Sequence, residues 1–360
     1  MVSSPPMTSV AVVQDPRFLA HLRDGGQLES HKRLEQIHAM LENLSGSLPL
    51  TPLAARTATQ ADLEMVHTAA YIQQVAQTAQ HSHSRLTADT YACAESYAVA
   101  ALAAGGVMSA IDAVVAGPVM SAFVLARPPG HHAEAGRAAG FCLFNNVALG
   151  AKYARTVLGL PKVLIVDWDV HHGNGIQHIF EQDPSVLYFS THQYPLYPGT
   201  GHFVEVGRGG GEGFNINVPL KKGMGDGEFV ALYNRLLKPV ALAFRPDLVV
   251  VAAGFDIHKK DPLGRMKATE IGFAGLTRII KGIAADCCQG RLVLVLEGGY
   301  HEKSLADSVR AVLAELCGQT CTDVDHLCSQ ASQRRIKPVI ARCTHVLERF
   351  WPCLGIGVHS

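Results

Sequence analysis

Two features of this 360-residue sequence predict an α/β fold with a largely parallel sheet. The first is a set of short apolar runs without polar alternation, which are typical of strands buried on both faces. The second is a set of longer, helix-compatible stretches that lie between those runs. Strands that alternate with helices predict one doubly wound α/β domain. The apolar runs are 121–125, 163–166, 186–189, 248–252 and 292–296.

Each expected helix precedes or follows one of these runs and has an apolar face. The expected helices are 94–115, 146–158, 227–244, 268–284 and 303–316. In sheets of this kind, ligands bind at the carboxyl ends of the strands. Every apolar run here ends in polar or glycine-rich sequence. The sequence therefore predicts a functional site at the carboxyl edge of the sheet.

Composition excludes several classes of protein. Lys plus Arg and Asp plus Glu both number 31, so a formal net charge of zero offers no general basic field for nucleic acid and no polybasic membrane anchor. Residues 1–13 lack a signal-peptide pattern, and no run approaches 18 apolar residues, so we expect neither a secretory signal nor a transmembrane helix. Nine scattered cysteines without a CxxC pair predict reduced thiols and a cytoplasmic protein.

A metal site is predicted where the run 163–166 ends. Asp167, Asp169 and His171 alternate along the chain, so they project to one side of an extended strand. Asp256 follows the run 248–252 and is the best candidate for a further ligand. Two carboxylates and one imidazole suit Zn²⁺ with a position left open for water, although Fe²⁺ or Co²⁺ would also fit. The alternative is that these acids cap helices or pair with buried arginine.

Two further segments carry candidate catalytic groups. His131 and His132 lie in a Pro-Pro-Gly loop, where a histidine beside a metal-bound water can act as general base or acid. Asp167 is a natural partner to orient them. Tyr300 follows two glycines that let a substrate approach closely, and its hydroxyl could donate to a developing oxyanion. Taken separately, an exposed histidine pair and a packing tyrosine are the ordinary interpretations.

Together and in this order, six motifs resemble those of the histone deacetylase family, which also contains acetylpolyamine amidohydrolases. They are RPPGHHAE (127–134), GFCLFNN (140–146), VDWDVHHGNG (166–175), YPGTG (197–201), GFDIHKKDPLG (254–264) and LEGGY (296–300). The resemblance implies an arginase-like three-layer fold around an eight-stranded, mostly parallel sheet. It implies one catalytic domain over 1–360, with about 320–360 as an extension that packs on it or mediates contacts.

The resemblance also implies a role for each matching residue. Asp169, His171 and Asp256 would bind zinc. His131 and His132 would be the catalytic pair, partnered by Asp167 and Asn174, and Tyr300 would polarise the carbonyl. Phe141 and Tyr197 would wall a narrow tunnel with Gly140 at its floor. Potassium would be a structural ion, held by backbone oxygens around 167–171 and Ser190, with a second site near Phe180, Asp183, Val186 and Phe214.

One position separates the subclasses of this family. Leu263 stands where an acetylpolyamine deacetylase places a gatekeeping glutamate, and leucine does not attract a cation. We therefore expect a zinc-dependent amidohydrolase that removes acetyl or other acyl groups from lysine side chains of a peptide or protein. A small-molecule or acetylpolyamine amidohydrolase is the first alternative, and a silent acyl-lysine-binding protein is the second. A binuclear arginase-like site lacks ligands for its second metal. A homo-oligomer remains open.

Overall fold

Eight parallel strands form the centre of the molecule, as predicted. The computed structural model describes residues 9–22, 28–44, 46–117 and 119–357. The strand order is β2-β1-β5-β10-β9-β6-β7-β8, and every neighbouring pair in this sheet is parallel. The strands are β1 (Val10–Val13), β2 (Leu50–Pro52), β5 (Ser121–Val124), β6 (Val163–Asp167), β7 (Val186–Gln193), β8 (Asn215–Leu220), β9 (Leu248–Ala253) and β10 (Leu292–Leu296).

The five predicted strands are β5, β6, β7, β9 and β10, and they occupy the interior of the sheet. Every residue of these strands is buried, which explains the apolar runs with which they begin; the structure extends β7 through the polar residues 190–193. The sequence analysis missed β1, β2 and β8. β8 is an edge strand that contains two asparagines and Pro219, and proline is tolerated there because an edge strand leaves one row of backbone groups unpaired.

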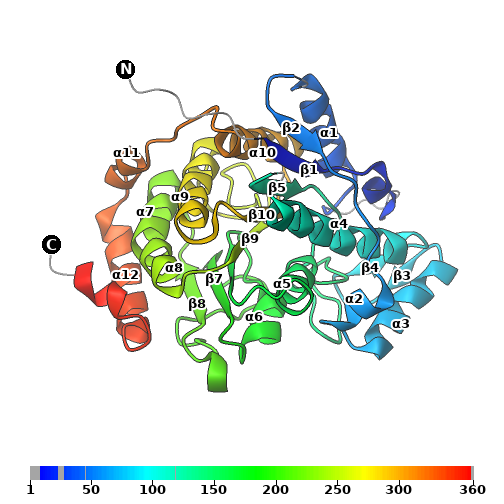
Figure 1. Cartoon of the computed structure of the whole chain (residues 1–360), viewed down its shortest axis with the longest axis horizontal. Helices are drawn as coiled ribbons and strands as arrows, with labels where there is room; N and C mark the ends of the chain where they lie inside the picture. The colour runs from blue at the N-terminus through cyan, green and yellow to red at the C-terminus, as the bar shows by residue number, and fades with distance from the viewer. Residues whose placement is uncertain (1–8, 23–27, 45, 118, 358–360) are drawn as a thin grey trace.

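Helices cover both faces of the sheet (Figure 1). α4 (Ser96–Ala116) and α5 (Asn146–Thr156) pack on one face, and α9 (Glu270–Cys288) packs on the other. Within the described residues, α4 alone is long and apolar enough to cross a membrane, with a hydropathy of 1.9. Because 72% of the most apolar 18-residue stretch of α4 is buried inside the protein, α4 serves here as a core helix.

The predicted helix 227–244 is interrupted. It consists of α7 (Asp226–Leu232), a π-helical turn η4 (Tyr233–Leu237) and α8 (Lys238–Phe244). Pro239 lies at the start of α8 and has no N–H to donate to the carbonyl one turn earlier, so the regular α-helical ladder cannot continue through it. The helix predicted over 227–244 is therefore wrong in its continuity, because Pro239 breaks the regular ladder.

The remaining elements surround this core. The 40 or so C-terminal residues pack on α7, β8 and α8 through α11, α12 and η5, and Trp351 Nε1 donates to the Gly213 carbonyl at 2.8 Å. All nine cysteines lie in the described part of the chain and are free thiols. The other elements are η1 (Pro16–Ala20), α1 (Lys32–Asn43), α2 (Gln60–Glu64), α3 (Ala69–Gln77), η2 (Thr78–Gln80), β3 (Ser84–Arg85), β4 (Tyr91–Ala92), α6 (Asn174–Phe180), η3 (Gly209–Gly211), α10 (Glu302–Leu316), α11 (Val324–Ser329), α12 (Gln333–Leu347) and η5 (Pro352–Gly357).

A buried charge cluster ties the segment before α1 to the centre of the sheet. Glu29 accepts hydrogen bonds from Arg127 at 2.7 Å and from Arg33 at 2.9 Å, and all three side chains are at most 1% exposed. Burial would raise the pKa of Glu29, but the two guanidinium groups outweigh burial and lower it to about 2. The two arginines therefore hold the glutamate in its ionised form.

We expect Glu29→Gln to lower the free energy of unfolding by about 3–5 kcal/mol, because it leaves two buried arginines without their counter-charge. The folded pKa of about 2 lies below the ordinary value of 4.5. The contribution of Glu29 is therefore present above pH 4.5 and is lost as pH falls towards 2. Urea unfolding should show the deficit of the variant shrinking over that window. The exposed Glu35→Gln on α1 is the control, and an equal loss in both variants would contradict the proposed role of the cluster.

Candidate active site

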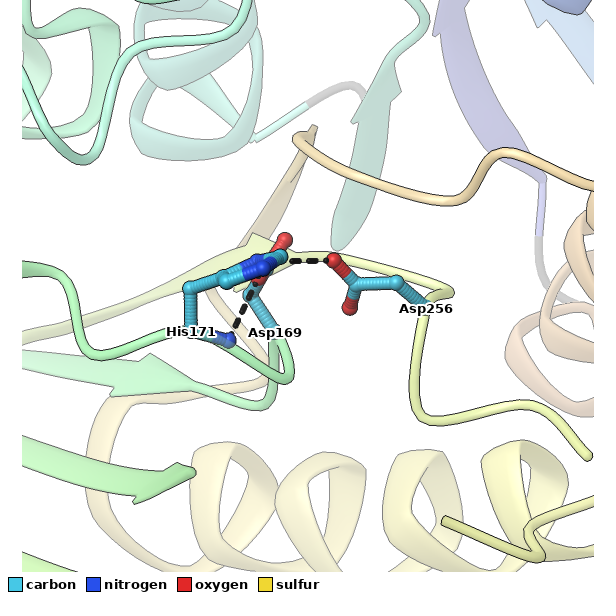
Figure 2. Close-up of side chains that lie close together, drawn as sticks. All are labelled: Asp169, His171 and Asp256. Carbon is cyan, nitrogen blue, oxygen red and sulfur yellow. Dashed lines mark hydrogen bonds and ion pairs between the residues drawn. The ribbon is translucent and has the colours of Figure 1, made fainter. Parts of the chain in front are cut away.

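Three side chains gather at the carboxyl ends of the neighbouring strands β6 and β9. Asp169 and His171 follow β6, Asp256 follows β9, and one potential ligand atom from each lies within 4.8 Å of the others. His171 Nδ1 is 2.9 Å from Asp169 Oδ1 and 3.2 Å from Asp256 Oδ2 (Figure 2). All three residues are buried. The structure thus brings together the three residues for which the sequence predicts metal binding.

Backbone groups hold the two carboxylates in place. Asp256 Oδ1 accepts from the Val170 N–H at 2.7 Å, and Asp169 Oδ2 accepts from the Gly298 N–H at 2.9 Å. Two glycines make this close approach feasible. A Cβ at Gly298 would collide with both carboxylates, and a Cβ at Gly254 would collide with Asp169. The glycines that follow β9 and β10 are therefore required by the packing of the site.

The chemistry of this group fits a divalent cation. Burial, followed by the repulsion of the Asp169 carboxylate, raises the pKa of Asp256 to about 8. Asp256 Oδ2 accepts no well-formed hydrogen bond within the described residues, although His171 Nδ1 lies 3.2 Å from it. Two buried carboxylates in contact are costly unless a positive charge offsets them. Two oxygens and one imidazole nitrogen are a ligand set suited to Zn²⁺.

The histidine pair lies beside this group, in the loop after β5. The rings of His131 and His132 are 4.0 Å apart, and each Nδ1 has a different partner. His131 Nδ1 lies 3.1 Å from Asp167 Oδ2, and His132 Nδ1 lies 2.8 Å from Asn174 Oδ1. Both histidines are 3% exposed. The Nδ1 atom of one histidine thus contacts a carboxylate, and the Nδ1 atom of the other contacts an amide oxygen.

The two histidines are held in different protonation states. Burial would lower the pKa of His131, but the Asp169 and Asp167 carboxylates outweigh burial and raise it to about 10. Burial, followed by the positive charge of His131, lowers the pKa of His132 well below its ordinary value. The two carboxylates thus favour His131 as the cationic member of the pair, and burial favours His132 as the neutral one.

A cavity of about 250 Å³ reaches His171 of the candidate metal site. The Phe141 and Tyr300 rings approach edge to face at 6.1 Å, and Tyr197 packs against His132 at 4.9 Å. Burial raises the pKa of Tyr300 well above its ordinary value, so its hydroxyl stays protonated and can donate. The structure places the predicted Gly140, Phe141, Tyr197 and Leu263 in the wall. The full lining is Asp89, His132, Gly140, Phe141, His171, Leu196, Tyr197, Leu263 and Tyr300.

Sequence reasoning missed four residues that build this site. Glu297 accepts from the His131 N–H at 3.1 Å and so holds the histidine loop. Asp261 accepts from the Tyr300 N–H at 2.6 Å and from the Leu263 N–H at 2.9 Å. Asp89 and Leu196 line the cavity. Glu297 and Asp261 stand inside recognised motifs, whereas Asp89 lies in a polar loop whose sequence has no distinguishing pattern.

Asp89 also supports strained backbone at the cavity. Gly140 and Phe141 have φ angles of +53° and +69°. The Gly140 N–H donates to Asp89 Oδ1 at 3.2 Å, and the Phe141 N–H donates to Thr90 Oγ1 at 3.1 Å. A phenylalanine in the left-handed region is uncommon and needs such support. The loop before α4 therefore fixes the position of the Phe141 ring.

Comparison with known proteins identifies the family. The model of the histone deacetylase domain matches residues 27–316. The chain belongs to the histone deacetylase family. It is 40% identical to Histone deacetylase 15 of Arabidopsis thaliana over 364 residues, which cover 99% of this chain and 65% of that protein. It is 44% identical to Polyamine deacetylase HDAC10 of Homo sapiens over 278 residues, which cover 74% of this chain and 41% of that protein.

A solved structure supports the same assignment. The crystal structure of the HDA15 HD domain aligns with a TM-score of 0.89 and 39% identity, over 97% of both chains. This member of the histone deacetylase family therefore has the fold implied by its motifs. It spans less than two thirds of the length of Histone deacetylase 15 and of Polyamine deacetylase HDAC10. Deacetylation is the shared activity in these names, and the substrates they name differ.

The potassium sites remain a prediction. Asp167 and Ser190 are partners on the neighbouring strands β6 and β7, so the backbone oxygens of the first site lie at the same level of the sheet. In the second region, the Asp183 N–H donates to the Phe180 carbonyl and the Val186 N–H donates to the Asp183 carbonyl. Those hydrogen bonds make a compact turn there. Binding of potassium to either place calls for direct measurement.

Proposed function

We propose that this histone deacetylase is a zinc-dependent protein lysine deacylase, acting first of all on acetyl-lysine. One observation carries the proposal. His132, His171 and Tyr300 line one cavity with aromatic walls, and His171 belongs to the buried group that fits a divalent cation. An aliphatic lysine stem suits the walls, and the amide would then meet polar groups at the base.

Asp169, His171 and Asp256 would hold the zinc ion. When bound, the ion polarises the amide carbonyl and lowers the pKa of water at the site. The protein supplies the proton transfers. Asn174 Nδ2 donates to Glu134 Oε1 at 2.6 Å, so Asn174 Oδ1 faces His132 and accepts a hydrogen bond from His132 Nδ1. His132 Nε2 is then the free acceptor.

This tautomer assigns His132 as the group that moves protons. His132 lines the cavity and can take a proton at Nε2 from the attacking water. It can then deliver the proton to the leaving lysine amine. His131 does not line the cavity. We assign it, with Asp167, to orienting its neighbour and to placing a positive charge behind the site.

Tyr300 would donate its hydroxyl hydrogen to the oxygen that gains negative charge during attack. The Tyr300 ring faces Phe141. The Arg33 guanidinium lies 5.1 Å from the centre of the Tyr300 ring. Arg33 Nε also donates to the Gly299 carbonyl at 2.6 Å. These contacts hold Tyr300 before substrate arrives, and such preorganisation makes a donor effective.

A polyamine deacetylase is the second candidate, because one relative at 44% identity carries that name. We favour acyl-lysine because the part-buried Leu263 lines the cavity and offers no charge to an incoming polyamine. We expect Leu263→Glu to raise the ratio of kcat/KM for acetylputrescine to that for an uncharged acetyl-lysine peptide. One added ion pair is worth about twofold to fivefold. Leu263→Gln is the uncharged control, and an equal shift in both variants would sink the charge argument.

The decisive experiment compares hydrolysis of an acetyl-lysine peptide and of acetylputrescine by the purified zinc-loaded protein. Chelator-sensitive turnover that favours the peptide would support the proposal. Turnover of acetylputrescine alone would overturn the substrate assignment and leave the mechanism standing. Failure to hydrolyse acetyl-lysine or longer acyl-lysine peptides, with zinc bound, would favour the silent acyl-lysine-binding protein.

A further inference from the structure

A second, larger cavity lies on the surface between the end of β8 and α12. It has a volume of about 440 Å³ and an apolar floor between cationic side chains. Five of its ten lining residues are lysine or arginine, and the other five are apolar, in a chain whose formal net charge is zero. We call it the basic groove. Its lining is Phe203, Pro219, Lys221, Lys222, Met224, Arg334, Arg335, Pro338, Val339 and Arg342.

The positive charge of the basic groove is not neutralised by the protein itself. Across the described residues, none of its five cations forms an ion pair. Arg335 hydrogen bonds the Gly223 carbonyl, and the Arg342 guanidinium lies 5.7 Å from the centre of the Phe203 ring. Lys221, Lys222 and Arg334 are exposed and make no side-chain hydrogen bond within the described residues. Like charges gathered without partners favour an anionic ligand.

The basic groove adjoins the mouth of the active-site cavity. Leu263 lines that cavity, and two residues further on the Arg265 carbonyl accepts from the Gly223 N–H at 2.8 Å. Gly223 lies between Lys222 and Met224 of the groove. Two residues of chain and one hydrogen-bonded crossing join Leu263 to Gly223, so these two residues lie at most about 12 Å apart. An extended peptide covers that distance in about four residues.

We propose that the basic groove binds an acidic segment of the acylated protein substrate, about four residues from the acyl-lysine in the tunnel. The inference rests on the proposed function, because it assigns a flanking sequence to that substrate. Carboxylate side chains would pair with cations on both walls, and the apolar side chains between them would cover the floor. Cationic flanks, such as those of a lysine-rich tail, and cationic polyamines would meet like charge there.

Half of the groove comes from an element outside the matched family region. Arg334, Arg335 and Arg342 project from α12 (Gln333–Leu347), which begins after residue 316, where the match to the family model ends. Lys221 and Lys222 follow β8 within the matched region. The C-terminal extension therefore supplies one wall of the groove, and the catalytic region supplies the other.

The test uses three acetyl-lysine peptides that differ only at positions three to five from the lysine, where they carry Glu, Gln or Lys. Two such series are made: in one the substituted residues precede the acetyl-lysine, and in the other they follow it. For the zinc-loaded protein we expect a preference for Glu in one of the two series, in which kcat/KM of the Glu peptide should exceed that of the Gln peptide about tenfold. Two or three ion pairs of about two- to fivefold each would give this ratio. The preference should weaken as salt rises.

Charge reversal separates the groove from the rest of the surface. In Lys221→Glu/Lys222→Glu, and independently in Arg334→Glu, the ratio of kcat/KM for Glu and Gln peptides should fall towards one. Lys32→Glu/Arg310→Glu removes exposed charges on α1 and α10 and should keep the ratio. Because each ratio is measured within one protein, partial loss of folded enzyme cancels.

Fluorescence anisotropy of a labelled Glu peptide gives a readout that needs no catalysis. The Glu peptide could bind the parent protein and fail to bind the charge-reversed variants, while no peptide is hydrolysed. That outcome would support the groove and overturn the proposed deacylase function. Hydrolysis with equal kcat/KM for Glu and Gln peptides would overturn the groove and leave the function standing. A labelled RNA or DNA oligonucleotide that binds through the same lysines, while the Glu peptide does not, would also overturn the proposal.

Discussion

Tyr300→Phe should lower kcat by about 10²–10³-fold while the zinc content stays unchanged. The substitution removes one hydroxyl that points at the developing oxyanion, and loss of a preorganised donor of this kind typically costs that much. KM should change little, because the Phe141 contact of the ring is retained. Steady-state kinetics on an acetyl-lysine peptide, with metal analysis of the same sample, would measure both quantities.

Tyr153→Phe is the matched control for this experiment. Its hydroxyl donates to Asp112 of α4 at 2.8 Å, and Tyr153 is not among the residues that line the cavity. It should leave kcat within about twofold of the unchanged protein. If Tyr300→Phe behaved in the same way, Tyr300 would not be the oxyanion donor, and the mechanism would need another one.

Asp256→Asn should abolish stoichiometric zinc binding and, with it, activity. Loss of a direct ligand should cost more than the 10–100-fold in metal affinity that is typical of residues behind the ligands. Zinc per chain after dialysis against a weak chelator is the measurement. Conservative replacement by asparagine keeps the side-chain volume, so the experiment separates charge from packing. A fully metallated variant would contradict the ligand assignment.

Stability gives an independent readout of the same substitution. The pKa of Asp256 is raised, because burial and Asp169 disfavour its charge. Without metal, this shift lowers the stability of the folded protein progressively as pH rises from 3.8, the ordinary pKa of the group, to about 8. At pH 9 the full cost is present, so metal-free Asp256→Asn should unfold at the same or a higher temperature than the metal-free parent. Added zinc should stabilise only the parent. Equal stabilisation of both proteins would place the zinc elsewhere.

The chemistry at the strand ends was more predictable from sequence than the edges of the sheet. The interior strands begin with apolar runs because both faces of the sheet are covered, and their polar residues lie towards the carboxyl ends. β8 has no such signature, since an edge strand tolerates Asn215, Asn217 and Pro219. β2 has only three residues, too few for any periodicity.

Residues that act by holding others were the hardest to predict. Asp89 and Thr90 are distant in sequence from Gly140 and Phe141, yet the fold lets them accept the backbone N–H groups of those two residues. The basic groove is likewise invisible in the sequence, because its cations come from two segments more than 100 residues apart. The formal net charge of the whole chain is zero, so overall composition does not reveal a local cluster of cations. The histidine pair, by contrast, could be predicted, because its two members are adjacent and lie in a recognisable loop.

The strand order has a consequence for biosynthesis. β10 is the last strand in the sequence, but it lies between β5 and β9 in the middle of the sheet. A nascent chain that has emerged only as far as β9 therefore holds two half-sheets with unpaired inner edges, which are prone to pair with other chains. Emergence of Leu292–Leu296 closes both edges at once and delivers Glu297, Gly298 and Tyr300 to the site. Completion of the sheet and completion of the catalytic centre should thus be one late event, and chaperones that shield strand edges should matter most before it.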